Sequence, residues 1–325
     1  MRPTLIGFAV LALALSPLRP AHAADPWPTK PVRLIVTASA GALTDTIGRF
    51  YGDKLSKAIG QPVIVDNKPG GGNVIGVQAA ARAPADGYTF LLGTAASFTS
   101  NSYTFKSLPY DPLKDFVCVS WLTRPGFTVV VNAKLPIRNL QDMVAYSQTK
   151  PGGLSVAVDG PRNFTGLTAA HLGKTIGAKM TLVPYANIVQ GMQDTASGIT
   201  DVVVTGYGLV QGLVGRGDLR AIAVTSPQRI RGLDNVPAVS ESYPGFGISG
   251  WIALFAPAGT PVEILTRVNR EMERIVQEPD TKAWAETIFE PVDAHAGTLA
   301  ELEEFVRSQN AMWGKMVEQM GVKPE

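Results

Sequence analysis

The sequence predicts an α/β protein of two lobes, each a mostly parallel sheet flanked by helices, with a ligand cleft between them. Strand and helix patterns alternate along most of the chain, which is typical of parallel sheets with right-handed crossovers. The chain has 325 residues, more than one hydrophobic core usually serves. Two apolar segments, 121–131 and 248–257, provide two places where the chain could cross between lobes.

The first hundred residues carry a strand–helix–strand–helix–strand pattern. Residues 32–36 form a short apolar run rich in β-branched side chains, which indicates a strand. Thr44 and Asp45 offer N-cap side chains, and apolar residues recur every four positions before Gly60, which predicts a helix over 45–59. The other elements predicted in this part are strands at 62–66 and 88–92 and a short helix through 77–82.

The middle of the chain repeats this plan. Strands are predicted at 127–132, 154–158, 180–184, 201–205 and 220–225. Helices are predicted at 140–148, 166–176, 188–197 and 208–215. Two later segments have the pattern of a capping box at a helix start, Thr260-Pro-Val-Glu263 and Thr298-Leu-Ala-Glu301.

Residues 1–23 have the pattern of a secretory signal peptide. A positive Arg2, an apolar run of 11 residues and the small-x-small site before position 24 follow in the required order. The run is too short to span a bilayer, so we expect cleavage after Ala23 and a periplasmic protein. The predicted domains are 1–23 as signal peptide, 24–124 and 252–325 as lobe 1, and 125–251 as lobe 2.

Charge and cysteine content exclude several classes of function. Removing residues 1–23 takes away Arg2, Arg19 and no acid, which leaves 27 basic and 27 acidic residues. A neutral chain gives no electrostatic reason to expect nucleic acid or anionic lipid as a partner. Cys118 is the single cysteine, so an intrachain disulfide and a thiolate metal site are excluded. No cofactor or metal is expected, and the protein is expected to be a monomer.

The segment 37–45 is the first candidate binding site, because it joins a predicted strand to a predicted helix with small residues. The first amides of a helix lack partners inside it and carry the positive end of its dipole, so a carboxylate fits there without a lysine. A plain tight turn is the alternative interpretation. The candidate ligand-binding residues in this segment are Ser39, Ala40, Gly41, Ala42 and Asp45.

The second lobe has a corresponding loop at 159–168. Thr165 or Thr168 could cap the following helix or donate a hydroxyl to a ligand, and Arg162 could bind an anion or lie in solvent. Ligands of such sheets collect at the carboxyl ends of parallel strands. The candidate residues from these strand ends and from the loop are therefore Thr94, Asn163, Thr165, Thr168, Tyr185 and Thr205.

Two motifs suggest alternatives to a binding protein, a serine nucleophile and a dinucleotide site. Ser39 at a strand–helix elbow could be a hydrolase nucleophile, but Thr37 stands where the Gly-x-Ser-x-Gly motif needs glycine. The mature chain has only His171 and His295 to complete a triad. The run Gly70–Gly76 resembles a dinucleotide fingerprint with the wrong spacing. The prediction is therefore a binding protein and not an enzyme, with a secreted serine hydrolase as the alternative.

Several segments in the right order resemble the receptors of tripartite tricarboxylate transporters, the Bug family. They are Trp27-Pro-Thr-Lys-Pro-Val-Arg-Leu-Ile-Val36, Gly60-Gln-Pro-Val-Ile-Val-Asp-Asn-Lys-Pro-Gly-Gly-Gly72, Ala85-Asp-Gly-Tyr-Thr-Phe-Leu-Leu-Gly93, Leu182-Val-Pro-Tyr185, Leu219-Arg-Ala-Ile-Ala-Val-Thr225 and Trp251-Ile-Ala-Leu-Phe-Ala-Pro-Ala-Gly-Thr-Pro261. The resemblance implies a two-lobed periplasmic binding protein fold of type II. It also implies a small organic anion, a mono- or dicarboxylate, as ligand and a membrane permease as partner. A binding protein that serves a sensory partner is a further alternative.

The chain differs from the family pattern where the ligand would bind. The family's first loop usually reads Pro-Phe-x-Ala-Gly-Gly-x-x-Asp, whereas this chain has Ala38 for the phenylalanine and Ala42 for the second glycine. The lysine common after Val-Pro-Tyr is Ala186. Loss of the aromatic side chain should enlarge or reshape the pocket, so a ligand other than citrate is expected.

Overall fold

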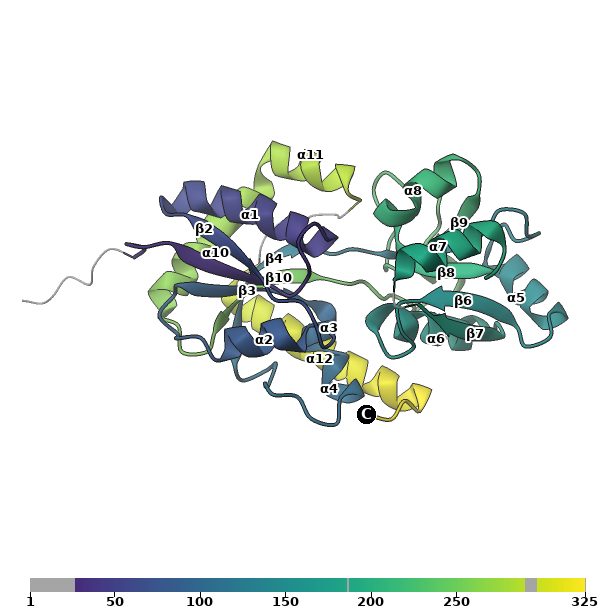
Figure 1. The fold of residues 1–325 in the computed structure, drawn as a ribbon, viewed down its shortest axis with the longest axis horizontal. Coiled ribbons are helices and arrows are strands. Elements are labelled where there is room, and N and C mark those ends of the chain that lie inside the picture. Colours follow the sequence, from purple (N-terminus) through teal and green to yellow (C-terminus); the bar gives the residue numbers. More distant parts are fainter. Residues whose placement is uncertain (1–26, 186, 290–296, 325) are drawn as a thin grey trace, which may run out of the picture.

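Two α/β lobes lie side by side in the computed structural model, which describes residues 27–185, 187–289 and 297–324 (Figure 1). The sheet of lobe 1 has the strand order β2-β1-β3-β10-β4, and the sheet of lobe 2 has the order β7-β6-β8-β5-β9. The proposed signal peptide, Ala186 and His295 lie outside the described residues. The strands are β1 (Val32–Val36), β2 (Val63–Asn67), β3 (Thr89–Thr94), β4 (Phe116–Thr123), β5 (Phe127–Asn132), β6 (Leu154–Val158), β7 (Met180–Pro184), β8 (Val202–Gly206), β9 (Leu219–Val224) and β10 (Ile252–Pro257).

Each sheet contains one strand that runs against the other four. In lobe 1, β1 pairs in parallel with β2 and β3, while β10 is antiparallel to both β3 and β4. In lobe 2, β6 pairs in parallel with β7 and β8, while β5 is antiparallel to both β8 and β9. The predicted α/β class is confirmed. The sheets are mixed, and the reversed strands are the one through which the chain enters lobe 2, β5, and the one through which it returns to lobe 1, β10.

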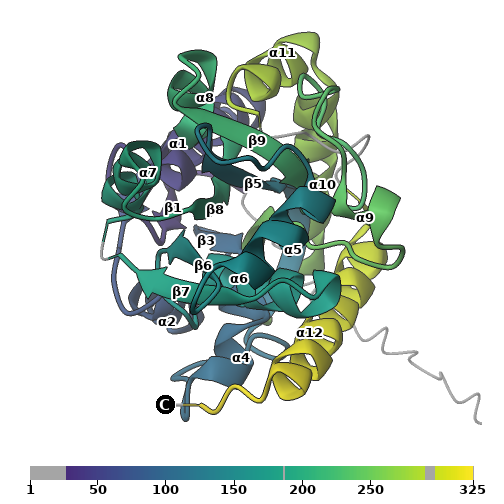
Figure 2. The same ribbon diagram turned by 90° about the vertical axis from the view of Figure 1, so that its right-hand side faces the viewer.

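Helices cover both faces of each sheet, and the views from two sides agree on their arrangement (Figures 1 and 2). In lobe 1, α1 and α10 pack on one face and α2, α3 and α12 on the other. In lobe 2, α6 packs on the face toward α12, and α7 and α8 pack on the opposite face. The helices are α1 (Leu43–Ile59), α2 (Val74–Ala81), α3 (Ala95–Phe98), α4 (Asn101–Thr104), α5 (Leu140–Thr149), α6 (Phe164–Ile176), α7 (Ile188–Ser197), α8 (Tyr207–Gly215), α9 (Val239–Ser242), α10 (Val262–Gln277), α11 (Pro279–Thr287) and α12 (Leu299–Met320).

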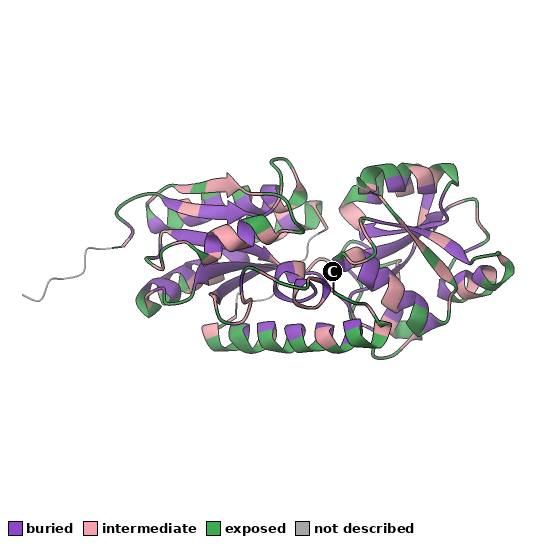
Figure 3. Cartoon of the chain, turned by 60° about the horizontal axis from the view of Figure 1, so that its bottom comes forward, coloured by how far each residue is buried: buried purple, intermediate pink, exposed green. Residues whose placement is uncertain are grey.

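The long helix α12 lies along both lobes, with its buried positions turned inward (Figure 3). Phe305, near its start, packs edge-on against Trp121 of β4, with ring centres 4.2 Å apart. The ring centre of Trp313 lies 4.3 Å from that of Phe164, the first residue of α6 in lobe 2. The lobes are therefore joined by α12 packing as well as by the two segments that connect β4 to β5 and lead into β10.

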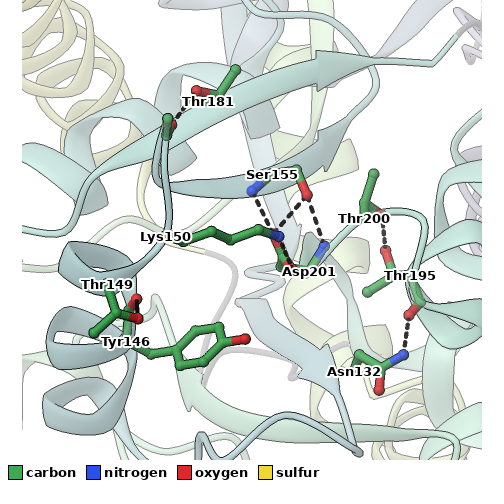
Figure 4. A network of polar contacts seen from close by, with 10 residues as sticks. Asn132, Tyr146, Thr149, Lys150, Ser155, Thr181, Thr195, Thr200 and Asp201 are labelled. Carbon is green, nitrogen blue, oxygen red and sulfur yellow. Dashed lines mark hydrogen bonds and ion pairs between the residues drawn. The ribbon is translucent and has the colours of Figure 1, made fainter.

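The amino-terminal edge of the lobe 2 sheet is held by a polar network (Figure 4). Lys150 Nζ lies 2.6 and 2.5 Å from the two carboxylate oxygens of Asp201. Ser155 donates to the same carboxylate from its backbone amide and from its hydroxyl, at 2.8 and 2.7 Å. Burial opposes ionisation of Asp201, but these hydrogen bonds and the Lys150 charge lower its pKa. The network fixes the starts of β6 and β8, at the edge opposite to the one where strands end.

Most predicted elements agree with the structure to within about three residues at each end, and the thiol of Cys118 in β4 is buried. The capping box at Thr298 is confirmed, because its hydroxyl accepts from the Glu301 amide and Glu301 accepts from the Thr298 amide. The box at Thr260 is wrong. Its hydroxyl donates to Pro257 O at 2.7 Å, and α10 starts after Pro261. The first residue of α1 is Leu43, so Asp45 lies within the first turn rather than before it.

None of the helices in the described ranges is long and apolar enough to cross a membrane.

Candidate ligand-binding cleft

A cavity of about 540 Å³ lies between the lobes, within the range of small-molecule sites. The cavity is lined by residues from the carboxyl ends of β3 and β8, from the loop after β6 and from the starts of the reversed strands β5 and β10. The arrangement follows from topology, because the ends of strands that run the same way meet at one edge. The lining residues include Leu43, Thr44, Asn73, Thr94, Asn101, Phe105, Phe127, Asp159, Arg162, Asn163, Phe164, Thr165, Ile188, Thr205, Leu209 and Trp251.

On the lobe 1 wall, the start of α1 faces the cavity through Leu43 and Thr44. Ala42 is the N-cap residue, and no side chain caps the helix. The amides of the first turn have no acceptors within the helix and concentrate positive potential there. An anion in the cavity therefore meets backbone donors on this side.

Two amides that the sequence analysis offered to a ligand are already used inside the loop. The Gly41 amide donates to Asp45 Oδ2 at 2.8 Å, and the Ala42 amide donates to Ser39 O at 3.1 Å. These bonds hold the turn in the shape that carries the chain into α1. At this helix start, the residues that line the cavity are Leu43 and Thr44, which follow Gly41 and Ala42.

The buried carboxylate of Asp45 holds this loop together through hydrogen bonds. Its carboxylate accepts from Arg49 Nε at 3.0 Å and from Asn67 Nδ2 at 2.9 Å, in addition to the Gly41 amide. Burial alone would raise the pKa of Asp45, but the hydrogen bonds from these three donors lower it below its usual value. Asn67 also donates to Ala38 O at 2.9 Å, so β2 and α1 together fix the loop.

On the lobe 2 wall, the start of α6 faces the cavity. Asn163 is its N-cap residue, and its side-chain amide donates to Asp159 O at 2.9 Å instead of capping the helix. The loop before α6 lies close to the helix at Gly166, where an added Cβ would lie 2.0 Å from Gly160 O. Only glycine permits this approach, which brings residues 159–162 over the helix start.

This second wall carries the two ionisable side chains of the described lining, Asp159 and Arg162. Asp159 Oδ1 accepts a hydrogen bond from Thr165 Oγ1. The Asp159 side chain is open to the cavity, but the surrounding protein displaces bulk water, and this desolvation raises its pKa. The lobe 2 wall therefore contributes charged side chains where the lobe 1 wall contributes backbone amides and neutral groups.

Four of the predicted site residues line the cavity: Thr94, Asn163, Thr165 and Thr205. Thr94 also holds the lobe 1 wall together, because its hydroxyl lies 3.3 Å from Asn73 Nδ2 and 3.2 Å from Ser97 Oγ. Thr205 precedes Gly206, the N-cap of α8, which is a further helix start without a side-chain cap at the cavity.

The remaining predicted residues are outside the lining. Ser39 and Ala40 are exposed in the turn before α1, and Gly41, Ala42 and Asp45 act within that turn as described. Thr168 is fully buried and donates to Phe164 O at 2.7 Å, a bond within α6. The Tyr185 hydroxyl donates to Asp194 Oδ2 at 2.8 Å, so this side chain is directed to α7.

Sequence reasoning missed much of the lobe 1 wall. Asn73 and Asn101 both face the cavity, and Asn101 Nδ2 donates to Gly72 O at 2.9 Å. Four successive residues, 70–73, have positive φ, which folds the chain sharply toward the cavity. The glycine run that was interpreted as a weak dinucleotide motif was the signal that could have found this loop.

The geometry lends no support to a serine nucleophile. Ser39 lies in lobe 1, whereas His171 is in α6 of lobe 2 and stacks on Phe246 with ring centres 5.5 Å apart. Among the described residues, no group of three His, Cys, Asp or Glu side chains could hold a metal ion.

Two sheets with one reversed strand each, joined by two crossings around a shared cavity, define a two-lobed solute-binding protein. The profile of the family described as "Tripartite tricarboxylate transporter family receptor" matches residues 47–322. The chain belongs to this family, as its resemblance to the Bug proteins predicted.

Individual proteins agree with this assignment. BugT of Bordetella pertussis is 30% identical over 303 residues, which cover 92% of each chain. A protein of R. palustris, solved with adipate, is 28% identical with a TM-score of 0.82, over 92% of this chain and all of that one. The periplasmic binding protein BugD is 25% identical with a TM-score of 0.78, over 92% of this chain and all of that one.

Proposed function

We propose that this protein is a periplasmic receptor that captures a small organic carboxylate in the interlobe cavity and delivers it to the permease of a tripartite tricarboxylate transporter. The observation that carries the proposal is the convergence of uncapped helix starts, α1 from lobe 1 and α6 and α8 from lobe 2, on one cavity. Such starts bind anions without a cationic side chain. The adipate in the R. palustris relative supports carboxylate as the ligand class.

The binding mechanism follows from the position of the donors on two walls. A carboxylate at the α1 start meets the Leu43 and Thr44 amides, and the other end of the ligand meets the loop of Asp159 to Thr165. Both walls contribute binding energy only when they share the ligand, so the ligand favours the arrangement in which the lobes are close. That arrangement changes the outer surface near the crossings and presents it to the permease.

The localisation belongs to the same proposal. The signal-peptide pattern of residues 1–23 predicts export, and BugD, a relative of similar fold, is a periplasmic binding protein. Cleavage after Ala23 is checked by mass spectrometry of the protein recovered from the periplasm.

The receptor is proposed to have no enzymatic activity. Replacing Ser39 by alanine should leave ligand binding within twofold of the wild type, because Ser39 is exposed and outside the cavity lining. A secreted hydrolase would instead lose ester turnover in this variant. A binding protein that serves a sensory partner would have the same binding chemistry. A transport assay with a tripartite tricarboxylate permease distinguishes it from a transport receptor.

The central experiment measures thermal unfolding of the purified protein with mono-, di- and tricarboxylates. A ligand at 100 times its Kd should stabilise the folded protein by about 2.7 kcal/mol. Neutral amides of the same acids are the matched controls, because they keep the carbon skeleton and lack the charge. If the acids and their amides shift the melting temperature equally, capture through helix starts is wrong.

A further inference from the structure

The cavity has more apolar lining than a polyanion needs. Aromatic and aliphatic side chains come from both lobes, among them Leu43, Phe105, Phe127, Ile188 and Leu209. A ligand that buries apolar surface against them gains binding free energy in proportion to the area removed from water. Citrate-like ligands have little such surface, so the lining favours a ligand with a hydrocarbon or aromatic body.

The charge of the lining argues the same way. Arg162 and Asp159 are the ionisable side chains of the described lining, and their charges cancel. The helix starts offer partial positive charge, which suits one carboxylate. A second or third carboxylate near Asp159 would face a like charge in a partly desolvated site, which is unfavourable.

The Asp159 carboxylate at the cavity can accept a hydrogen bond from a donor on the ligand. A carboxylate has about four acceptor positions. Thr165 Oγ1 donates to Oδ1, and the Asn163 side chain and the Asp159 amide also donate to this carboxylate, which leaves about one position open. The Thr165 bond and the Asn163 bond to the Asp159 backbone orient the residue within the α6 loop. An acceptor held in this way at an anion site is satisfied when the bound molecule presents an O–H or N–H group to it.

Resting on the proposed function, we infer that the ligand is a monocarboxylate with an apolar body and a hydrogen-bond-donating substituent, a hydroxyl or an ammonium group, and that Asp159 recognises this substituent. The carboxylate lies at the α1 start, the body lies among the apolar side chains, and the donor faces Asp159 in the lobe 2 loop. Asp159 is then a specificity-determining residue, and Thr165 is its positioning residue.

The test is calorimetric titration of the full-length mature protein with two matched series. One series is 3-phenylpropanoate, 3-phenyllactate and phenylalanine, and the other is 4-methylpentanoate, 2-hydroxy-4-methylpentanoate and leucine. In at least one series the wild type should bind a hydroxy or amino acid at least tenfold more tightly than the unsubstituted acid. The better of the two arms identifies the donor as hydroxyl or ammonium.

Variants connect the preference to the proposed residue. D159N should reduce the preference to threefold or less, and T165V, which keeps the carboxylate but removes its orienting hydroxyl, should reduce it in part. D53N, which changes an exposed acid on α1, is the control and should keep the full preference. T165V also gives a measurement if D159N does not fold.

The failure of this inference is distinguishable from the failure of the proposed function. If adipate or citrate binds while all six probes fail, the ligand class inferred here is wrong and the carboxylate receptor stands. If the probes bind with a preference that survives D159N and T165V, the role of Asp159 is wrong. If no carboxylate of any kind binds, the proposed function fails as well.

Discussion

The two walls of the cleft reach the same edge of their sheets by different means. In lobe 1, the loop before α1 is closed by Asp45, which is 2% exposed and accepts from Gly41, Arg49 and Asn67. In lobe 2, the loop before α6 keeps its charged groups, Asp159 and Arg162, at the cavity. Under the proposed function, lobe 1 supplies a fixed set of backbone donors, and lobe 2 supplies the side chains that discriminate between ligands.

This difference predicts how each wall responds to substitution. Changes in the lobe 1 loop should alter stability and weaken all carboxylates alike, whereas changes at the lobe 2 side chains should alter preference at nearly constant stability. The following variants test that division, in order of decreasing expected effect.

The largest effect is expected from G166A, because its Cβ would lie 2.0 Å from Gly160 O and would push the lobe 2 loop off the helix. Overpacking against backbone should lower the unfolding free energy by about 3 kcal/mol and abolish carboxylate binding. Urea unfolding and calorimetry measure the two effects. G215A in α8 is the control, since a Cβ there meets no atom within 4 Å and should be neutral or slightly stabilising. Wild-type behaviour of G166A would mean that the close approach does not shape the site.

The second effect concerns D45N in the lobe 1 loop. Three donors lose a charged acceptor, which should lower the unfolding free energy at pH 7 by about 2 kcal/mol. The folded pKa of Asp45 lies below its unfolded value of about 3.9, so its contribution is complete above that value and is lost as the pH falls through the folded pKa.

The stability difference between wild type and D45N should therefore shrink as the pH is lowered from 6 to 3, as measured by urea unfolding at each pH. D53N is the control on the same helix, because Asp53 is exposed and its carboxylate pairs with the exposed Lys57. If the difference in unfolding free energy between wild type and D45N stays constant over this pH range, the stabilising role of the Asp45 carboxylate is wrong.

The third effect is on the ligand rather than the fold. R162Q should weaken carboxylate binding about tenfold, the scale of a charge-assisted hydrogen bond, and leave the melting temperature within about 1 °C. Calorimetry at two salt concentrations should also show a weaker salt dependence than in the wild type. R138Q, at an exposed position of the same lobe, serves as the control. If R162Q and R138Q bind the carboxylate with equal affinity, Arg162 does not contribute to ligand recognition.

The smallest effect is expected from R231Q, which breaks the ion pair between Arg231 of lobe 2 and Glu286 of α11 at 3.0 Å. Both side chains are largely exposed, so the pair should contribute at most a few tenths of a kcal/mol. The Kd for a carboxylate should change less than twofold. A change of tenfold would show that contacts outside the cleft control the approach of the lobes.

The sequence predicted the parts of this structure that depend on local patterns. Periodicity and turn residues located the strands and helices, and the strand ends and the loop 159–168 gave Thr94, Asn163, Thr165 and Thr205, which line the cavity. Local patterns do not show contacts between residues far apart in the sequence. Asn67 of β2 donates to the Asp45 carboxylate and helps to hold it inside the loop, and β10 pairs with β3 and β4, more than 120 residues away.

The place of β10 in the lobe 1 sheet also divides the chain into a continuous and a discontinuous folding unit. Residues 252–257 separate β3 from β4, so the lobe 1 sheet is complete only when β10 has joined them. The strands of lobe 2 all come from the continuous segment 127–224. The inserted lobe can therefore assemble from neighbouring parts of the chain, whereas its host needs contacts between segments far apart in the sequence, which form more slowly.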